Sequence, residues 1–494
     1  MSSPAFVVGS TDRLLIGGQQ CLPATPVEPA EVVDPATGRV IGYAPVGGPV
    51  DVDRAVAAAR DAGRHWGSSD PAFRADLLDR VAQRITDRID DFAAVITAEM
   101  GAPVDNARDV QTQLAIDVFR SYATIAREFV WSEPLRAGVV RYEPIGVVAA
   151  ITPWNYPLYL AAIKIAAALA AGCTVVFKPS QDAPLDAVLL VETIVEVAGD
   201  LGAPPGIVNL VTGSGSVVGE AISTHPGIAA VSFTGSTEAG RRVSAAASAT
   251  VKRVGLELGG KSAAIILDDG VDLTTALSGA LAGVFYNSGQ TCTACARILV
   301  PRHRYEEAIS IAAELAGGWE IGDPRLPGDH IGPIATRAQY ETVRRYLQVG
   351  VDEGARLLCG GVPDEAALDD EMRDGYWVLP TVFAGVEPGM TIEREEIFGP
   401  VALVMAYDDD DDAVRIANDS IYGLSGAVWG TDTARMLAVA GRLETGRVVL
   451  NGGPFDVVAP TGGYKQSGNG RELGLHGLRE YLEVKSVLFP GEQS

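Results

Sequence analysis

The spacing of hydrophobic residues changes along the chain, and each change predicts a different kind of element. Between residues 51 and 127 apolar side chains recur every three or four positions, which predicts amphipathic helices, one of them ending near Gly101. The stretch GVVRYEPIGVVAAITPW, residues 138–154, is rich in β-branched residues and has a turn signal at Pro144 to Gly146. A mainly helical segment is therefore expected to precede a β-rich one.

Short apolar strands alternate with helical stretches between residues 157 and 260. The candidate strands are CTVVFKPS, GIVNLVTGS, IAAVSFTGS and RVGLELGG. Such alternation predicts βαβ crossovers and a parallel sheet. A second alternating pattern follows, with candidate strands SAAIILDD, ARILVP, VALVMAY, GAVWG and GRVVLNG. The chain is therefore expected to be an α/β protein with two sheet-containing regions.

The end of the chain combines three patterns. A Gly-rich loop, TGGYKQSGNG, is followed by a predicted helix, RELGLHGLREYLE, and a last predicted strand, VKSVLF. A lone apolar strand at a terminus needs an edge to pair with, and that edge belongs either to another subunit or to its own. Both options stay open from the sequence.

Composition narrows the kinds of partner. The chain has 494 residues, of which 47% are hydrophobic, so it can form sizeable cores and has a prior of about three domains. Its 39 basic and 63 acidic residues give a net charge of −24, which argues against nucleic acid or an anionic membrane as a partner. An anionic cofactor is still compatible with this charge, because helix N-termini and one lysine act locally.

The compartment is inferred from the cysteines and from the absence of targeting signals. The start, MSSPAFVVGSTDRLLIGG, lacks the basic and apolar regions of a signal peptide, and no apolar run is long enough to span a membrane. The five cysteines are odd in number and mostly isolated, which is typical of a reducing compartment. We therefore expect a cytoplasmic protein.

Two glycine-containing turns are candidates for a phosphate site. Gly213-Ser-Gly215 and the stretch from Gly235 to Gly240 each lie between a predicted strand and a helix, where backbone N–H groups can hold a pyrophosphate. Neither has the G-x-G-x-x-G spacing, so ordinary βα turns are the alternative. Lys178 ends the strand TVVFK and is a candidate donor to a ribose or phosphate.

The stretch NSGQTCTAC places Cys292 and Cys295 three residues apart. A structural zinc site would need a second ligand pair, and the remaining cysteines and the histidines are scattered. A redox-active dithiol would belong to a much smaller domain, after an early strand. A single nucleophile beside small and polar residues is the leading functional hypothesis, and an inert buried cysteine is its alternative.

Other polar residues have a functional and a structural interpretation. Glu257 ends a strand before two glycines, so it is either a general base or an ordinary surface glutamate. Asn155, within PWNYP, is either a helix N-cap or an amide donor to an oxyanion. The run from Asp408 to Asp412 resembles a metal cluster, but it precedes AVRIAND and is better explained as an acidic helix N-terminus. No metal site is expected.

Eight motifs occur together and in order: PWNYPL, FKPS, FTGSTEAG, ELGGKS, GQTC, EEIFGP, YGLSGAVW and GGYKQSGNGREL. Together they resemble the aldehyde dehydrogenase superfamily over roughly residues 15–490. The resemblance implies a modified Rossmann dinucleotide-binding domain, an α/β catalytic domain and a small β oligomerisation arm. It also implies the oxidation of an aldehyde with water and NAD or NADP in a homo-oligomer, a dimer or a tetramer.

The resemblance also assigns roles to residues. Cys292 would be the nucleophile, Glu257 the base that activates water, and Asn155 a donor to the oxyanion, with Lys164 supporting the site from behind. The implied cofactor site consists of Trp154, Lys178, Ser180, Gln181, Gly215, Gly235, Ser236, Leu258, Glu396 and Phe398. The implied substrate funnel consists of Tyr156, Tyr159, Ile163, Thr293, Phe455 and Thr461.

Two residues depart from the pattern of this superfamily. Gln181 stands where a glutamate often binds the adenosine ribose, so the lost charge leaves both NAD and NADP open. Thr461 replaces a phenylalanine common before GGYK, which opens or polarises the funnel. No arginine can be assigned to a substrate carboxylate. A medium-sized apolar or aromatic aldehyde is therefore expected.

Two other activities compete with hydrolytic oxidation. A CoA-acylating aldehyde dehydrogenase would not need Glu257 as a water-activating base, and a non-enzymatic member would not need Cys292, Glu257 and Asn155. Cys295 is expected in the turn after Cys292, and one open hypothesis is that it forms a disulfide with an oxidised Cys292. The expected domains are cofactor-binding (1–126 and 145–257), arm (127–144), catalytic (258–460), and a C-terminal loop, helix and oligomerisation strand (461–494).

Overall fold

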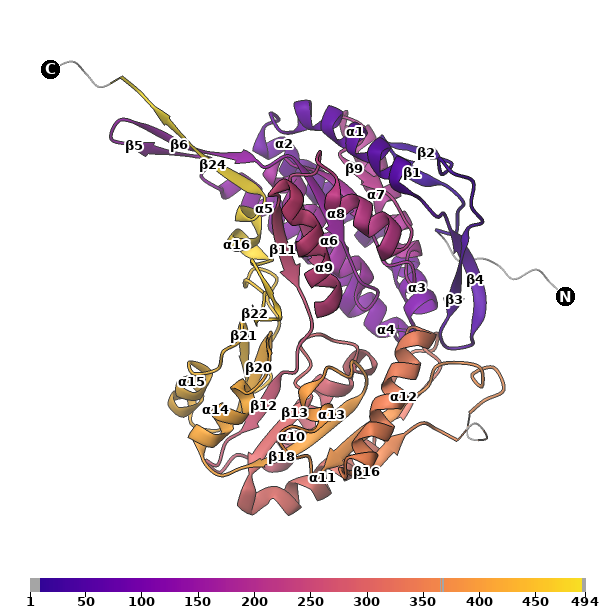
Figure 1. Cartoon of the computed structure of the whole chain (residues 1–494), viewed down its shortest axis with the longest axis vertical. Helices are drawn as coiled ribbons and strands as arrows, with labels where there is room; N and C mark the ends of the chain where they lie inside the picture. The colour runs from indigo at the N-terminus through magenta and orange to yellow at the C-terminus, as the bar shows by residue number, and fades with distance from the viewer. Residues whose placement is uncertain (1–8, 365, 367, 491–494) are drawn as a thin grey trace.

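The structure, a computed structural model, describes residues 9–364, 366 and 368–490. Figure 1 shows two halves, one above the other, and an arm that projects from the upper half. Within the described residues, the upper half contains an eight-stranded sheet, the lower half a seven-stranded sheet, and the arm a sheet of three strands.

The helical segment predicted for residues 51–127 is confirmed, as a series of helices. The third of them ends at Gly101, whose φ of 79° closes the helix in the left-handed conformation that glycine adopts without strain. A π-helical turn, η1, precedes α5, the last helix of the series. The elements are α1 Pro49–Trp66, α2 Pro71–Asp87, α3 Ile89–Met100, α4 Val104–Asn106, η1 Ala107–Thr112 and α5 Gln113–Glu128.

The alternation predicted for residues 157–260 is confirmed by the first sheet. Its strand order is β2-β1-β9-β8-β7-β10-β11-β23, and β7 to β11 are parallel. The strands are β1 Leu14–Ile16, β2 Gln19–Cys21, β7 Val147–Ile151, β8 Thr174–Lys178, β9 Val208–Leu210, β10 Ala230–Thr234, β11 Arg253–Glu257 and β23 Gly468–Asn469. The connecting elements are α6 Pro157–Ala171, α7 Leu185–Leu201, η2 Gly215–Gly219, α8 Glu220–Thr224, α9 Thr237–Ala247 and η3 Ser248–Thr250.

The strand order of the first sheet reverses between β7 and β10. From β7 the chain adds β8 and β9 on one side and then β10 and β11 on the other. Alternate residues of β7 enter different cores: Val148 and Ala150 pack with α5, α6 and α7, while Ala149 and Ile151 pack with α8 and α9. Because both faces are covered, the crevice for a ligand is expected beyond the carboxyl ends of these strands, at the reversal.

The second sheet has the order β16-β17-β18-β13-β12-β20-β21, and all neighbours except β16 and β17 are parallel. Its strands are β12 Ala263–Ile266, β13 Arg297–Pro301, β16 Arg356–Gly361, β17 Leu379–Ala384, β18 Val401–Tyr407, β20 Ser425–Trp429 and β21 Arg447–Leu450. The associated helices are α10 Leu273–Phe285, η4 Tyr286–Gly289, η5 Arg302–Arg304, α11 Tyr305–Gly317, α12 Arg337–Asp352, α13 Thr391–Arg394, α14 Asp410–Asn418 and α15 Thr433–Ala440.

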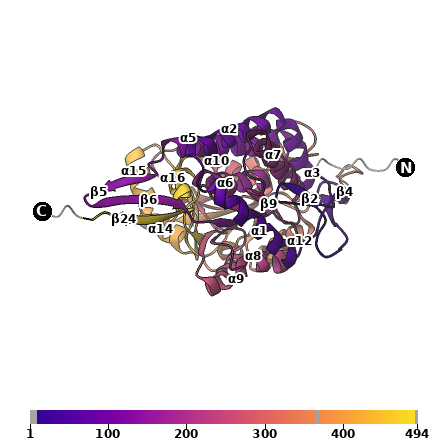
Figure 2. The ribbon, with the colours of Figure 1, turned by 90° about the horizontal axis from the view of Figure 1, so that it is seen from above.

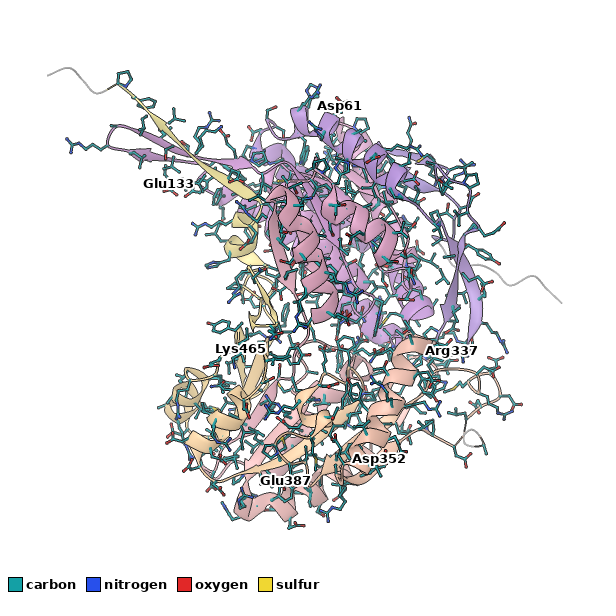
Figure 3. All side chains as sticks on the ribbon, in the orientation of Figure 1. Asp61, Glu133, Arg337, Asp352, Glu387 and Lys465 are labelled. Atoms are coloured by element: carbon teal, nitrogen blue, oxygen red, sulfur yellow. The ribbon has the colours of Figure 1, made fainter. Side chains whose placement is uncertain are left out.

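The C-terminal segment connects the two halves. Its short strand β22 (Tyr464–Lys465) pairs with β19 (Tyr422–Gly423) of the lower half, and β23 then joins β11 of the upper sheet. Lys465, labelled in Figure 3 near the level where the halves meet, donates a hydrogen bond to the Asn418 carbonyl at 2.7 Å. The remaining short pairs are β3 Ala30–Asp34 with β4 Arg39–Ala44, and β14 Glu320–Ile321 with β15 His330–Ile331.

The last strand pairs within its own chain, one of the two options left open by the sequence. β24 (Leu482–Leu488) runs antiparallel to β6 (Gly138–Pro144), which also pairs with β5 (Ser132–Leu135). Figures 1 and 2 show these strands leaving the body together, and Glu133 is labelled on them in Figure 3. The predicted C-terminal helix is too long, because α16 ends at Arg479 (Gly474–Arg479) and the chain from Leu482 onward joins β6 instead.

Candidate active site

A cavity of about 180 Å³ contains the side chains expected to react. Cys292, Glu257 and Asn155 all line it. So do Leu258 and the whole set expected for the substrate: Tyr156, Tyr159, Ile163, Thr293, Phe455 and Thr461. Residues distant in sequence thus meet in one place, although their chemical roles stay predictions.

The first sheet positions one side of this cavity. Asn155 follows β7, and Glu257 is the last residue of β11. Ile151 of β7 is the register partner of both Lys178 and Phe233, while Thr234 is that of Glu257. The carboxyl ends of these parallel strands therefore lie in one row, at the reversal of strand order where open α/β sheets bind ligands.

A loop from the lower half brings Cys292 to the other side of the cavity. Its backbone is left-handed at Asn287, Ser288 and Gly289, with φ values of 53°, 56° and 71°. A Cβ on Gly289 would overlap the Gly399 carbonyl, so only glycine fits this approach. Two non-glycine residues in this conformation cost free energy, which indicates that the surroundings hold the loop in place.

Neutral amides hold this loop. The Asn155 amide donates to the Gln290 carbonyl at 2.9 Å, and the Asn287 amide donates to the Asn155 carbonyl at 3.0 Å. Gln290 donates to the Asn287 carbonyl at 3.1 Å and accepts from the Ala335 N–H at 2.8 Å. The Asn155 amide has two N–H groups, and the hydrogen bond to Gln290 uses one of them.

The surroundings of the Cys292 thiol favour its protonated form. Burial, with the charges of Glu396 and Glu257, raises its pKa to about 12 against the lowering effect of the cation Arg447. The thiolate is the nucleophilic form of cysteine. Attack by Cys292 therefore needs a proton acceptor or an additional positive charge in the site.

Glu257 has an unusual environment for a carboxylate. Its Oε1 is buried and has no hydrogen-bond partner among the described residues. Burial raises the pKa of Glu257 well above its ordinary value, and the charge of Glu472 raises it further, against the lowering effect of Lys164 and Arg471. A carboxyl group with a raised pKa is suited to take a proton from a reactant near neutral pH.

Lys164 lies behind Glu257 and does not line the cavity itself. Its side chain is completely buried and forms an ion pair with Glu472, with Nζ 2.5 Å from Oε1. Lys164 also donates to Ser232 at 3.0 Å, and Ser232 donates to the same Glu472 oxygen at 3.2 Å. The lysine therefore acts through a glutamate that lines the cavity.

The substrate side of the cavity is mainly aromatic and aliphatic. The rings of Tyr159 and Phe455 meet edge to face, with centroids 6.0 Å apart. The Tyr156 hydroxyl hydrogen-bonds the Thr291 hydroxyl at 2.8 Å, next to Cys292. Thr461 exchanges two backbone hydrogen bonds with Glu472, at 2.9 and 2.8 Å, which fixes the loop where the usual phenylalanine is absent.

The residues expected for the adenosine and pyrophosphate lie along neighbouring strand ends. Lys178 is buried at the end of β8, burial lowers its pKa to about 8, and its Nζ donates to the Pro179 carbonyl at 2.9 Å. Ser180 hydrogen-bonds Asp182, and Gln181 is exposed. Gly215 begins η2, and Gly235 precedes Ser236, whose hydroxyl caps α9 by accepting from the Ala239 N–H at 3.3 Å.

A second group of expected cofactor residues lies near Cys292. The Gly260 N–H donates to Glu396 at 3.0 Å, and burial raises the pKa of Glu396 to about 7. A Cβ on Gly259 would overlap the Glu396 carboxylate, so the glycine leaves room for it. Phe398 has a left-handed backbone, with φ of 57°, and its ring meets that of Trp154 edge to face at 5.6 Å.

Sequence reasoning missed several residues of the cavity. Arg447, the first residue of β21, lines it, whereas the sequence gave no arginine that could be assigned to a substrate carboxylate. Glu472 lies within the motif GGYKQSGNGREL, so its position was a signal without an assigned role. Thr234, Thr291 and Leu424 likewise lie within quoted motifs without an assigned role. The other lining residues gave no signal of their own: Val110, Leu114 and Leu160.

The remaining motifs have structural explanations. Asp409 caps α14 by accepting from the Asp412 N–H at 2.9 Å, so the aspartate run is the expected helix N-terminus. In the described part of the chain no group of three or more potential metal ligands comes together. No helix of the described residues is long and apolar enough to cross a membrane. Cys295 packs against the core of the second sheet, and burial raises its pKa to about 12.

Comparisons with known proteins agree with this geometry. The sequence model of the aldehyde dehydrogenase family matches residues 23–487. The chain is 46% identical to the 3-succinoylsemialdehyde-pyridine dehydrogenase of a Pseudomonas species, over 93% of this chain and 94% of that protein. It is 40% identical to the geranial dehydrogenase of Castellaniella defragrans, over 97% and 99% of the two chains.

Solved structures show the same fold. A cysteine-to-alanine variant of aldehyde dehydrogenase C from Pseudomonas syringae, in complex with NAD+ and octanal, matches with a TM-score of 0.95 at 43% identity, over the whole of both chains. The betaine aldehyde dehydrogenase of Staphylococcus aureus, in complex with NAD+, matches with a TM-score of 0.93 at 34% identity, over 98% and 96% of the chains. The predicted α/β fold is thereby confirmed, and the chain belongs to the aldehyde dehydrogenase family.

Proposed function

We propose that this protein oxidises an aldehyde to its carboxylic acid with NAD(P)+ and water. The observation that carries the proposal is the meeting of Cys292, Asn155 and Glu257 in one cavity. These side chains supply a nucleophile, an oxyanion donor and a base, which are the groups that oxidation through a thioester requires.

The first half of the reaction takes place at Cys292. The Cys292 thiol first passes its proton to water, and the thiolate then attacks the aldehyde carbonyl. The tetrahedral thiohemiacetal that forms has an alkoxide, which accepts hydrogen bonds from the second Asn155 N–H and the Cys292 backbone N–H. Donors held in place before the charge develops stabilise it without reorganisation. The hydrogen bond from Asn155 to the Gln290 carbonyl orients the amide for this purpose.

The second half of the reaction takes place at Glu257. Water must lose a proton as it attacks the thioester, and a buried carboxylate without a hydrogen-bond partner is available to take it. The raised pKa of Glu257 makes it a stronger base than an exposed glutamate. The Lys164–Glu472 ion pair supports this wall of the cavity.

The residues present fit a dinucleotide. Gly219 lies beside the Lys178 stem and Gly259 beside Glu396, and each lacks a side chain that would fill the space. Lys178 and the N-terminus of α9 at Ser236 would hold ribose and phosphate, and Glu396 and Phe398 the nicotinamide end. When bound, NAD(P)+ supplies the hydride acceptor. Because Gln181 carries no charge to repel a 2′-phosphate, both cofactors are proposed, and their kcat/KM ratio distinguishes them.

The substrate is proposed to carry an apolar or aromatic body of medium size. Tyr156, Tyr159, Ile163 and Phe455 line the cavity with rings and aliphatic groups. Among similar proteins, one is named for geranial and one structure contains octanal. Binding of the hydrocarbon part would bury it against these side chains.

The decisive test is oxidation of an aldehyde panel with NAD+ or NADP+, followed by the absorbance of the reduced nicotinamide and by the acid formed. Free carboxylate formed without CoA supports the hydrolytic reaction. A product that appears only with CoA supports the CoA-acylating alternative. The position of Glu257 in the cavity argues against that alternative, because transfer to CoA needs no base that activates water. The absence of any reduced cofactor with every pair would refute the proposed function.

A homo-oligomer, dimer or tetramer, is proposed from the arm. Within the described residues β24 has only β6 as a neighbour, so its outer edge is free for a second copy. Val484 and Leu488 on this strand are 66% and 72% exposed. The mass of the protein in solution tests this proposal. A cytoplasmic location likewise stays a prediction.

A further inference from the structure

Arg447 places a guanidinium group in the wall of an otherwise mainly apolar substrate cavity. It is the first residue of β21, the edge strand of the second sheet, and its backbone is paired with Ser425 of β20. This backbone pairing fixes the position of the Arg447 Cα atom, from which the side chain extends. Its Cζ lies 5.5 Å from the centre of the Phe455 ring, so the guanidinium also rests against an aromatic side chain of the same cavity.

This guanidinium has no anionic partner in the described part of the chain. The Arg447 side chain is half-buried, and its Nε is buried without a hydrogen-bond partner, whereas the buried arginines Arg74 and Arg297 donate to carbonyl or carboxylate groups. A buried polar atom without a partner costs free energy. The presence of such a group is explained if a bound anionic ligand supplies the missing partner of the guanidinium.

The acidic groups of the cavity do not neutralise Arg447. Glu472 already forms an ion pair with Lys164 and accepts from Ser232. Glu257 forms no ion pair with Arg447, its Oε1 has no partner among the described residues, and burial disfavours its charged form by raising its pKa. The substrate side of the cavity therefore has one cation that pairs with no anion of the described residues, next to the rings of Tyr159 and Phe455.

We propose that the preferred substrate is an aldehyde that carries a carboxylate at its far end, and that Arg447 binds this carboxylate. The carbonyl lies at Cys292, the hydrocarbon between them packs against Tyr159 and Phe455, and the carboxylate accepts hydrogen bonds from the guanidinium. This substrate class rests on the proposed function and replaces its purely apolar aldehyde with an ω-oxo acid. A planar guanidinium is well matched to a carboxylate, which takes up two parallel hydrogen bonds.

The first experiment compares aldehydes that differ only at the far end. Succinic, glutaric and adipic semialdehydes are measured against butanal, pentanal and hexanal, and the methyl ester of adipic semialdehyde serves as a neutral acceptor of similar length. At the best length kcat/KM for the acid exceeds that for the matched alkanal by about 10- to 100-fold, mainly through KM, as expected for a charge-assisted hydrogen bond. Alkanals that match or surpass the acids at every length would overturn the inference, and so would an ester equal to the acid.

The second experiment replaces the cation. In Arg447→Met the preference for the acid over the alkanal collapses by about tenfold or more, whereas the matched control Arg80→Met, on the exposed face of α2, retains it. A retained preference in Arg447→Met would contradict the role of Arg447. Should this variant fail to fold, inhibition of wild-type hexanal oxidation decides instead: adipate, which carries a second carboxylate at its far end, competes with hexanal, and hexanoate does so at least tenfold more weakly. Equal inhibition would overturn the inference, and failure to oxidise any aldehyde would refute the proposed function itself.

Discussion

The two walls of the cavity hold their reactive groups by different means. The amide wall consists of Asn155, which lines the cavity, and of Asn287 and Gln290, which support it from outside the lining; their neutral hydrogen bonds fix a left-handed loop that presents Cys292. The charged wall consists of Glu257 and Glu472, which line the cavity, and of Lys164, which forms an ion pair with Glu472 from outside the lining. The amides of the first wall carry no charge, so they provide geometry. The pKa of Glu257 in the second wall is raised, so this wall is expected to make thioester hydrolysis depend on pH.

Loss of the thiol tests the amide wall most severely. Cys292→Ala keeps the loop and its hydrogen bonds but has no nucleophile, so kcat for aldehyde oxidation falls at least about a thousandfold. The measurement is steady-state cofactor reduction. Cys295→Ala is the matched control and retains activity, since Cys295 packs against the core of the second sheet. Activity that disappears in the control and persists in Cys292→Ala would reverse the assignment of the nucleophile.

Loss of the base tests the charged wall in the same way. Glu257→Gln still forms the thioester, so it releases a burst of reduced cofactor, but its steady-state turnover falls about 100-fold because no group takes the proton from water. Rapid-mixing absorbance separates the burst from the slow phase. A variant that turns over at the wild-type rate would show that Glu257 is not the base.

A smaller change in the amide wall tests whether geometry alone matters there. Gln290→Ala removes the hydrogen bonds to Asn287 and Ala335, so the loop loses its anchors and kcat falls about tenfold or more. Because Gln290 carries no charge, the pH profile keeps its shape while its height falls. A profile displaced along the pH axis would mean that the amide wall also controls protonation.

Loss of the Lys164–Glu472 ion pair is expected to have the smallest effect on turnover. Its effect is specific to the pH dependence of thioester hydrolysis. Glu257 acts as a base only after it loses its proton, and its pKa is raised, so thioester hydrolysis in the wild type increases as the pH rises. Lys164 lowers this pKa, so Lys164→Met displaces the rise to higher pH. It also leaves Glu472 without its buried partner and destabilises the fold by about 3 kcal/mol. The measurements are the pH profile of the slow phase and the thermal midpoint.

An unshifted profile in a folded Lys164→Met protein would reduce the ion pair to a structural role. Ser232→Ala is the milder control, because it removes one hydrogen bond to Glu472 and leaves both charges in place. Its pH profile is expected to stay close to that of the wild type.

Much of the candidate site was predictable, because some residues carry local patterns. Lys178 and Glu257 end apolar strands, and the carboxyl ends of parallel strands share one edge of a sheet. Cys292 stands in a motif that resembles a family, and that family is confirmed. The alternation of strands and helices likewise predicted both sheets.

Other features were not predictable, because their local sequence pattern is also typical of a different structure. Arg447 opens a strand of the form GRVVLNG, where an arginine usually faces solvent, and only the packing of β21 beside the loop of Phe455 brings it to the cavity. The C-terminal helix was predicted too long, since Leu478, Tyr481 and Leu482 follow the i, i+3, i+4 spacing of a helix, whereas the following VKSVLF predicts a strand. Pairing of β24 with β6 decided between them.

The sequence by itself determined most of the elements, the row of strand ends and the family, and it proposed the reacting groups, because these depend on local spacing and on motifs. Only the tertiary structure decided that Lys164 is paired with Glu472, that Glu257 has an oxygen without a partner, and that Arg447 lines the cavity without an anionic partner among the described residues. The physical reason is that burial and charge pairing depend on segments far apart in the chain. Where those segments meet, the pKa of a carboxyl group and the charge of a cavity are set.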